Sequence, residues 1–187
     1  GHETSVVLFG LGQIGRALTR QLLQQDRYFR HGLGQEVRVV CAADRSGLVV
    51  AEQGFGRDEL ESMLDRKAQG RPLGRRSKGE PKAVGAELAR ALWPVALPRP
   101  VFVDATALDD APVILEALRH GFHVVLANKK PLAAPQEQYD ALFAAAREQG
   151  VQLRYEATVG AGLPVLDTLR KLEEAGDRVQ TVLGALS

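Results

Sequence analysis

The feature that most constrains the fold of this chain is a glycine-spaced turn set between a strand-like run and a helix-like run. Residues Ser5 to Phe9 are mostly apolar and include β-branched and aromatic side chains, as expected of a buried strand. The turn from Gly10 to Gly15 follows directly, and apolar residues then recur at the spacing of one helix face. The residues of that face are Ile14, Ala17, Leu18 and Leu22.

Each glycine of the turn has a physical reason to be there. Gly10 allows a tight turn, Gly12 lets a pyrophosphate lie against the main chain, and Gly15 lets helix and strand pack closely. The spacing alone is weak evidence, but the strand before it and the helix after it favour a dinucleotide site at the amino end of the helix.

Further apolar runs alternate with helix-like stretches and extend this unit into a sheet. The strand-like runs are Val37 to Ala42, Pro100 to Asp104, His123 to Ala127 and Val151 to Tyr155. Continuous apolar strands separated by helices favour parallel pairing with both faces covered. The sequence therefore predicts an α/β fold, a Rossmann-type, doubly wound, mostly parallel sheet with helices on both faces and ligands at the carboxyl ends of the strands.

Two helices are indicated by their end signals. Asp109 and Asp110 are expected to cap a helix that ends at Gly121, and a later helix is expected to end at Gly150. The expected inward residues are Val113, Ile114, Ala117 and Leu118 in the first helix, and Tyr139, Leu142, Phe143 and Ala146 in the second.

The segment from Arg45 to Pro98 fits the alternation least. Within it, Asp58 to Ala68 and Val84 to Trp93 favour helices, and Gly47 to Val50 is apolar. The basic run from Gly70 to Lys82 is expected to be a mobile surface loop because of its glycine and proline. A phosphate or nucleic-acid contact is the less favoured alternative, because the run has no aromatic residue that could stack on bases.

Composition limits the classes of partner. In 187 residues, 24 basic and 23 acidic side chains leave a net charge of +1, so no global field draws the protein to nucleic acid or to a membrane. The one cysteine, Cys41, has no disulfide mate and lies in an apolar run, which favours a buried role in a reducing compartment. Without a bilayer-length apolar stretch or a signal-peptide pattern, the protein is expected to be cytoplasmic.

Asp44 and Arg45 follow the second strand, where this fold reads the adenosine ribose of the cofactor. An acidic residue there accepts from the ribose hydroxyls of NAD, whereas an arginine pairs with the extra phosphate of NADP. Asp44 lies 29 positions after Gly15, beyond the usual spacing of about 20, and the polar insertion from Tyr28 to Glu36 accounts for the excess. A simple turn role for Asp44 stays open, and Arg45 favours NADP slightly.

Two more strand ends carry polar residues toward the same crevice. Thr106 can hydrogen-bond a nicotinamide ribose or amide through its side chain or backbone, while Asp104 can equally cap the turn. After the next strand, Pro131 keeps the pair Lys129 and Lys130 extended, so only one of the two can face the crevice. That ammonium could hold a carboxylate or polarise a carbonyl, with Asn128 orienting it; exposure for solubility is an equal alternative.

A second glycine-rich turn stands between Tyr155 and Pro164. There Glu156 is followed by a turn from Gly160 to Gly162 and then by an amphipathic helix. Because glycine lets backbone groups approach a bound group and a helix amino end favours anions, this segment is predicted to be part of the site.

Together these segments resemble homoserine dehydrogenase. The matching motifs are Gly10 to Gly15, Val103 to Ala107, Ala127 to Lys130 and, most specifically, Tyr155 to Pro164 with Gly176 and Asp177 beyond it. The opening Val6 to Gly10 also looks like the dehydrogenase half of bifunctional aspartokinase–homoserine dehydrogenases. The resemblance spans the chain apart from residues 45–98.

The resemblance implies a reversible, NAD(P)-dependent interconversion of L-homoserine and L-aspartate 4-semialdehyde, a step towards threonine and methionine. The expected cofactor-binding residues are Gly10, Leu11, Gly12, Gln13, Ile14, Gly15, Asp44, Arg45, Thr106, Asn128 and Lys129, with Lys129 also the catalytic candidate. Glu156 and the carbonyls of Val159, Ala161 and Leu163 resemble a monovalent-cation site for sodium or potassium. A carboxylate with several carbonyl oxygens suits a hard cation.

The chain is expected to divide into a cofactor domain, residues 3–155, and a segment 156–187 that holds the cation-site loop, a connecting helix and the start of a truncated substrate and dimerisation domain. Because it stops at Ser187, it is expected to bind cofactor but to turn over negligibly. The apolar edge from Thr181 to Leu186 could pair with a second copy as a homodimer. The alternative is another NAD(P)-dependent oxidoreductase or a nucleotide-redox sensor, because a fold does not determine a function.

Overall fold

The computed structural model describes residues 2–73, 81–127, 131–133, 135–155 and 168–171. Six strands of this described chain form one sheet in the order β3-β2-β1-β4-β5-β6. The strands are β1 (His2–Phe9), β2 (Gln35–Asp44), β3 (Gly47–Val50), β4 (Pro100–Asp104), β5 (His123–Leu126) and β6 (Leu153–Tyr155). The helices are α1 (Gln13–Arg27), the π-helical η1 (Tyr28–Gly32), α2 (Arg57–Ala68), α3 (Pro81–Ala91), α4 (Ala111–Arg119) and α5 (Gln136–Gln149).

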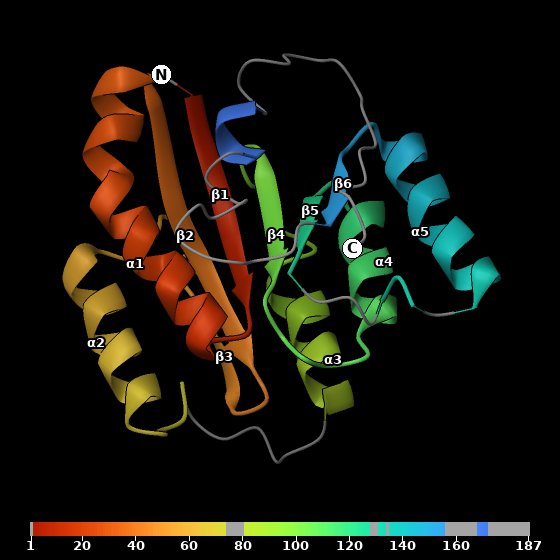
Figure 1. Cartoon of the computed structure of the whole chain (residues 1–187), viewed down its shortest axis with the longest axis horizontal. Helices are drawn as coiled ribbons and strands as arrows, with labels where there is room; N and C mark the ends of the chain where they lie inside the picture. The colour runs from red at the N-terminus through yellow and green to blue at the C-terminus, as the bar shows by residue number, and fades with distance from the viewer. Residues whose placement is uncertain (1, 74–80, 128–130, 134, 156–167, 172–187) are drawn as a thin grey trace.

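The sheet is parallel except at β3, which runs antiparallel to β2. The chain moves outward from β1 to β2 and β3, and then β4 pairs with the other side of β1 (Figure 1). The carboxyl ends of β1, β2 and β4 therefore share one edge, with the change of direction at the end of β1. In open α/β sheets this is the place where ligands bind.

Helices cover both faces of the sheet, which confirms the predicted Rossmann-type, doubly wound fold. Because successive side chains of a strand point to opposite faces, β1 contributes Val7 and Phe9 to one apolar cluster, and Val6 and Leu8 to another. The first cluster includes residues of α3, α4 and α5, and the second includes residues of α1 and α2. Figure 1 shows α1 and α2 on one side of the sheet and α3, α4 and α5 on the other.

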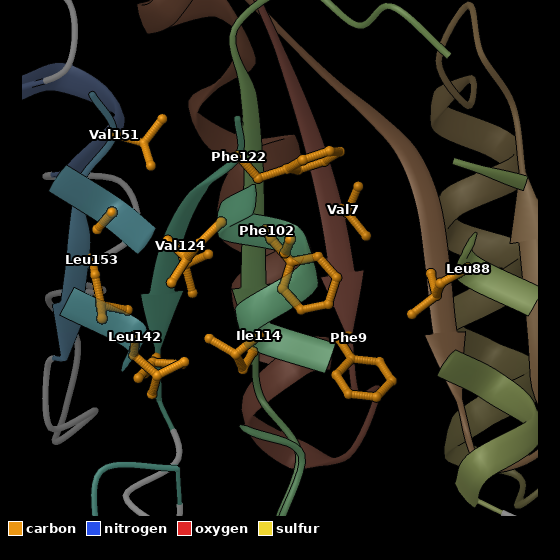
Figure 2. Packing of buried hydrophobic residues seen from close by; sticks show 14 of the residues in the cluster. Val7, Phe9, Leu88, Phe102, Ile114, Phe122, Val124, Leu142, Val151 and Leu153 are labelled. Carbon is orange, nitrogen blue, oxygen red and sulfur yellow. The ribbon is translucent and has the colours of Figure 1, made fainter. Parts of the chain in front are cut away.

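The first cluster is built around aromatic rings. Phe9 and Phe102 lie side by side, with ring centroids 5.6 Å apart, between Ile114 of α4 and Leu88 of α3 (Figure 2). All four side chains are almost fully buried, and burial of one such side chain typically stabilises a fold by about 1.5–3 kcal/mol. This packing anchors the strand ends that carry the polar residues of the shared edge.

The element bounds depart from the sequence predictions in several places. The run at 47–50 is an antiparallel strand, and the predicted loop from Gly70 to Lys82 ends early because Pro81 already begins α3. Residues 74–80 of that loop lie outside the described residues. Tyr28 to Glu36 is not simply a polar insertion, because η1 continues α1 there and buries Phe29. On α1 the buried face is Gly15, Leu18, Thr19 and Leu22, whereas Ile14 and Ala17 are exposed.

Cys41 is fully buried in β2, as predicted, and this burial raises the pKa of its thiol above the usual value. Within the described part of the chain, no helix combines the length and the apolar character that crossing a bilayer requires.

Candidate dinucleotide site

A cleft of about 530 Å³ opens at the carboxyl edge of the sheet, over the ends of β1, β2 and β4. It brings together six residues that the sequence predicted for cofactor binding, namely Gly10, Leu11, Gly12, Asp44, Arg45 and Thr106. Its other lining residues are Arg16, Ser46, Lys67, Ala105, Ala107 and Leu108. Residues from four separate parts of the sequence therefore meet around one space.

The glycine turn has the geometry that the sequence predicted. Gly10 has a φ of 102°, and a Cβ on it would lie 2.7 Å from the backbone of Ala105. A Cβ on Gly15 would overlap the carbonyl of Gly10, so this residue permits the close contact of α1 with the turn. Gly12 is the N-cap of α1, and a Cβ there would meet nothing within 4 Å among the described residues. Gly12 therefore leaves room for a bound group, and Gly10 and Gly15 serve the fold.

Asp44 ends β2 and is held on both of its carboxylate oxygens. The backbone N–H and the hydroxyl of Ser46 donate to Oδ1, with the N–H at 2.7 Å. The ammonium of Lys67, in the last turn of α2, lies 2.5 Å from Oδ2. The turn role that the sequence left open for Asp44 is present, together with an ion pair that the sequence did not predict.

The cleft carries an excess of positive charge on this side. Three of its lining residues are basic, Arg16, Arg45 and Lys67, and one, Asp44, is acidic. Arg16 donates to the carbonyl of Leu11 at 3.0 Å, which holds its guanidinium over the glycine turn, and Arg45 is exposed at the rim. Helix α1 adds its unpaired amino-terminal N–H groups. This arrangement suits a ligand with several phosphates.

A second turn follows β4 and has the same side-chain hydrogen bonds as the turn at Asp44. The backbone N–H of Thr106 donates to Asp104 Oδ1 at 3.0 Å, and the hydroxyl of Thr106 donates to the same oxygen at 2.8 Å. The backbone N–H of Leu108 donates to that hydroxyl at 3.2 Å. Asp104 is therefore a turn residue with no exposed surface. The hydroxyl of Thr106 is thus engaged within the turn, and Thr106 also lines the cleft.

Asp110 lies under this turn, at the start of α4. It occupies the N-cap position, but within the described residues its carboxyl makes no capping hydrogen bond, contrary to the sequence prediction. Instead Asp110 Oδ2 lies 3.2 Å from the hydroxyl of Thr106. Burial, followed by the neighbouring charge of Asp104, raises the pKa of Asp110 to about 8.

Some predicted residues stand apart from the cleft or outside the described chain. Gln13 and Ile14 are exposed at the start of α1 and do not line the cleft. The residues outside the description are Asn128, Lys129, Glu156, Val159, Ala161 and Leu163. Among the described residues, no group of three or more histidine, cysteine or acidic side chains could hold a metal ion.

Sequence reasoning missed Arg16, Ser46, Lys67 and Asp110 as members of this edge. The Asp-x-Ser pattern at 44–46 is a known turn signal and could have pointed to Ser46. Lys67 had no local signal, because its partner Asp44 lies on another element and the path of α2 is set by tertiary packing.

Comparison with protein families gives one match that covers most of the chain. The family described as "Homoserine dehydrogenase, NAD binding domain" matches residues 10–156. That range holds every lining residue of the cleft.

Individual relatives agree with this match. A chloroplastic bifunctional aspartokinase/homoserine dehydrogenase 2 of Zea mays is 31% identical over 184 residues, 98% of this chain and 19% of that protein. A homoserine dehydrogenase of Pyrococcus horikoshii is 30% identical over 186 residues, 98% of this chain and 53% of that protein. The solved structure of a hyperthermophilic archaeal homoserine dehydrogenase in complex with NADPH is similar with a TM-score of 0.64 and 28% identity, over 89% of this chain and 48% of that one. The chain thus spans about half the length of these archaeal relatives.

Proposed function

Since this chain belongs to the homoserine dehydrogenase family, we propose that it binds NADP(H) in the cleft and supplies the coenzyme domain of an enzyme that interconverts L-homoserine and L-aspartate 4-semialdehyde. The pyrophosphate would lie over Gly12 and the amino end of α1, where space and N–H donors coincide. The nicotinamide would extend toward the turn after β4, in line with the usual placement across this edge.

The observation that carries the choice of NADP is the state of Asp44. A residue that reads the ribose hydroxyls of NAD needs free carboxylate lone pairs, but Ser46 and Lys67 already occupy three of the roughly four acceptor positions of Asp44. Lys67 and Arg45 leave this corner net positive, which suits the extra phosphate of NADP. The complex of an archaeal relative with NADPH supports the same choice.

Further parts of the proposal concern residues outside the described chain. Lys129 would act at the nicotinamide and substrate side, with Asn128 orienting it. Glu156 with the carbonyls of Val159, Ala161 and Leu163 would hold a sodium or potassium ion. Their support is the resemblance of the sequence motifs. Replacement of potassium and sodium by a bulky ammonium salt, with the thermal unfolding temperature as the readout in wild type and Glu156→Gln, tests the cation site.

The protein is also proposed to be cytoplasmic and to form a homodimer in its complete form. Residues 3–155 would form the coenzyme domain and residues 156–187 the segment that begins the substrate domain, within which Leu169 is fully buried in the apolar cluster on the α1 face of the sheet. Sedimentation of the purified chain with and without NADPH tests the homodimer.

Calorimetric titration of NADPH and NADH tests the coenzyme assignment. Wild type is expected to prefer NADPH, and Arg45→Ala and Lys67→Ala are each expected to weaken NADPH binding about 10- to 100-fold, because a hydrogen bond to a charged group contributes about 1.5–3 kcal/mol. NADH affinity should change much less. Equal affinity of wild type for both coenzymes would defeat the phosphate role.

A matched control separates charge in the cleft from charge elsewhere. Arg57 is exposed on α2 and pairs with Glu61 rather than with any cleft residue, so Arg57→Ala should leave both affinities unchanged. Binding of neither coenzyme by wild type would overturn the dinucleotide function itself. A marked preference for one redox form together with no response to homoserine would favour the nucleotide-redox sensor.

A further inference from the structure

The turn after β4 rests on two buried carboxyl groups that meet at one hydroxyl. Asp104 has no exposed surface, and Asp110 is 4% exposed. Thr106 Oγ1 lies 2.8 Å from Asp104 Oδ1 and 3.2 Å from Asp110 Oδ2. Two carboxylates so close to each other in a buried place disfavour each other's ionisation.

The hydrogen bonds indicate which group carries the proton. A threonine hydroxyl has one proton and two lone pairs. Thr106 uses its proton in the shorter bond to Asp104, and it accepts from the N–H of Leu108. Its contact with Asp110 is then a hydrogen bond only if Asp110 donates. We call Asp104, Thr106 and Asp110 the β4 cluster. With Asp110 as a neutral acid, its contact with Thr106 is a hydrogen bond. With Asp110 ionised, two acceptor oxygens, that of Asp110 and that of Thr106, would face each other.

The surroundings of Asp110 offer no compensating cation among the described residues. A second cavity of about 440 Å³ lies beside it, between α3 and α4. The facing residues Phe9 of β1, Ala86 of α3 and Trp93 just after α3 are uncharged, and the other charged lining residues are the acids Asp109 and Glu116. Asp110 Oδ1 is buried with no hydrogen-bond partner in the described chain. Each of these features opposes a negative charge on Asp110.

The β4 cluster can affect the cleft, because the turn that it supports forms one wall of the cleft. Ala105, Thr106, Ala107 and Leu108 all line the cleft. A bound dinucleotide brings its phosphate charges to the same edge, and in the low-dielectric interior those charges further disfavour ionisation of Asp110.

We propose that Asp110, as a neutral acid, is a positioning residue that holds the turn from Ala105 to Leu108 in its coenzyme-binding form, so that coenzyme binding is coupled to retention of one proton. This inference rests on the dinucleotide function proposed above. Ionisation of Asp110 in alkaline solution would then lower the affinity for the coenzyme, although Asp110 touches neither coenzyme nor substrate.

Titration of NADPH between about pH 7 and pH 9.5 tests the proposal, because a binding reaction that requires one proton weakens by at most about tenfold per pH unit above the pKa of the free group. Wild type is expected to bind about tenfold more weakly at the upper end of this range. Asp110→Asn, which mimics the neutral acid, should lose less than about twofold. Asp109→Asn removes the exposed neighbouring carboxylate and should retain the wild-type decline.

A second measurement on wild type keeps the test independent of how the variant folds. Calorimetry near pH 8 in two buffers that differ in ionisation enthalpy should reveal net proton uptake when NADPH binds. Absence of uptake, or a decline of equal size in Asp110→Asn, would overturn the role of Asp110 while leaving the dinucleotide function intact. No binding at any pH would overturn both.

Discussion

Two turns at the carboxyl edge of the sheet have the same hydrogen-bond pattern but differ in the charge of the side chain that packs beside them. In each, an aspartate ends a parallel strand and accepts from the N–H and the hydroxyl of the residue two positions later, Ser46 after β2 and Thr106 after β4. The partner brought in from a helix then differs. Asp44 receives the ammonium of Lys67, whereas the cluster of Asp104 receives a second carboxyl, that of Asp110.

The difference shows how one local motif can serve two purposes. The same Asx turn fixes the backbone in both places, while the helix that packs beside it sets the charge that the cleft presents. The turn after β2 therefore suits a bound anion, whereas the turn after β4 suits a protonated carboxyl group, that of Asp110.

Gly10→Ala should have the largest effect, because Gly10 lies between the two turns. Its N–H donates to the carbonyl of Ala43 at 2.8 Å, and its missing Cβ faces the backbone of Ala105. An alanine at this position would have to adopt a left-handed φ, and its Cβ would collide with the backbone of Ala105. We therefore expect a loss of roughly 3 kcal/mol or more in the free energy of unfolding. Denaturant unfolding measures it.

Gly12→Ala is the matched control for this change. Its Cβ would enter open space in the described chain, so stability should change by less than about 0.5 kcal/mol, while NADPH binding is lost. An equal loss of stability in both variants would show that the turn tolerates no side chain at all and that Gly12 has no special link to the coenzyme.

Lys67→Met should destabilise the protein by about 2 kcal/mol at neutral pH, because it leaves a mostly buried carboxylate without its cation. The side chains of Lys67 and Asp44 are only 15% and 14% exposed. Adding Asp44→Asn should recover part of this loss, which a double-mutant cycle by thermal unfolding measures. If Lys67→Met costs nothing, the ion pair does not distinguish the β2 turn.

The two hydroxyls allow a direct comparison of the turns. Thr106→Val should cost about 2 kcal/mol, because the hydroxyl joins two buried carboxyls and one backbone N–H, while Ser46→Ala should cost about 1 kcal/mol, because Lys67 remains beside Asp44. Chemical unfolding of both variants decides the order. The reverse order would mean that the β4 cluster contributes less to stability than its geometry indicates.

Asp110→Asn should have a small effect of the opposite sign. Since the pKa of Asp110 is raised in the folded state from 3.8 to about 8, its contribution to stability is fully present below about pH 4 and is lost as the pH rises towards 8. The variant lacks this loss. It should match wild type near pH 4 and exceed it by about 1 kcal/mol at pH 8, since relaxation around a buried charge limits the gain. Thermal unfolding as a function of pH measures the difference, and curves that stay parallel would contradict it.

The fold was largely predictable because its signals are local. Continuous apolar strands, the helix end at Gly150 with its φ of 67°, and the strand-turn-helix at Gly10 each follow from short-range chemistry. The antiparallel β3 was not predictable, because four apolar residues after a turn specify no direction of pairing. The exposure of Ile14 also escaped, because helical spacing does not say where on a helix the contact with the sheet begins.

The candidate site was predictable in part, for a related reason. Residues that follow strands, such as Asp44, Arg45 and Thr106, were located because parallel strands bring their carboxyl ends to one edge. Lys67 and Asp110 reach that edge from helices, and their pairing with Asp44 and Asp104 depends on packing that no short pattern encodes. The helix-capping role expected of Asp110 was wrong because the hydroxyl of Thr106 competes for its carboxyl.

The position of Cys41 gives the protein a built-in reporter. It is the one thiol of the chain, it has no exposed surface, and it lies on β2 three residues before Asp44. A thiol-directed reagent therefore reacts only when the sheet opens around β2, and the labelling rate measures how often that happens. A dinucleotide seated at the end of the same strand would slow the reaction in proportion to its occupancy, so occupancy can be followed without any attached dye.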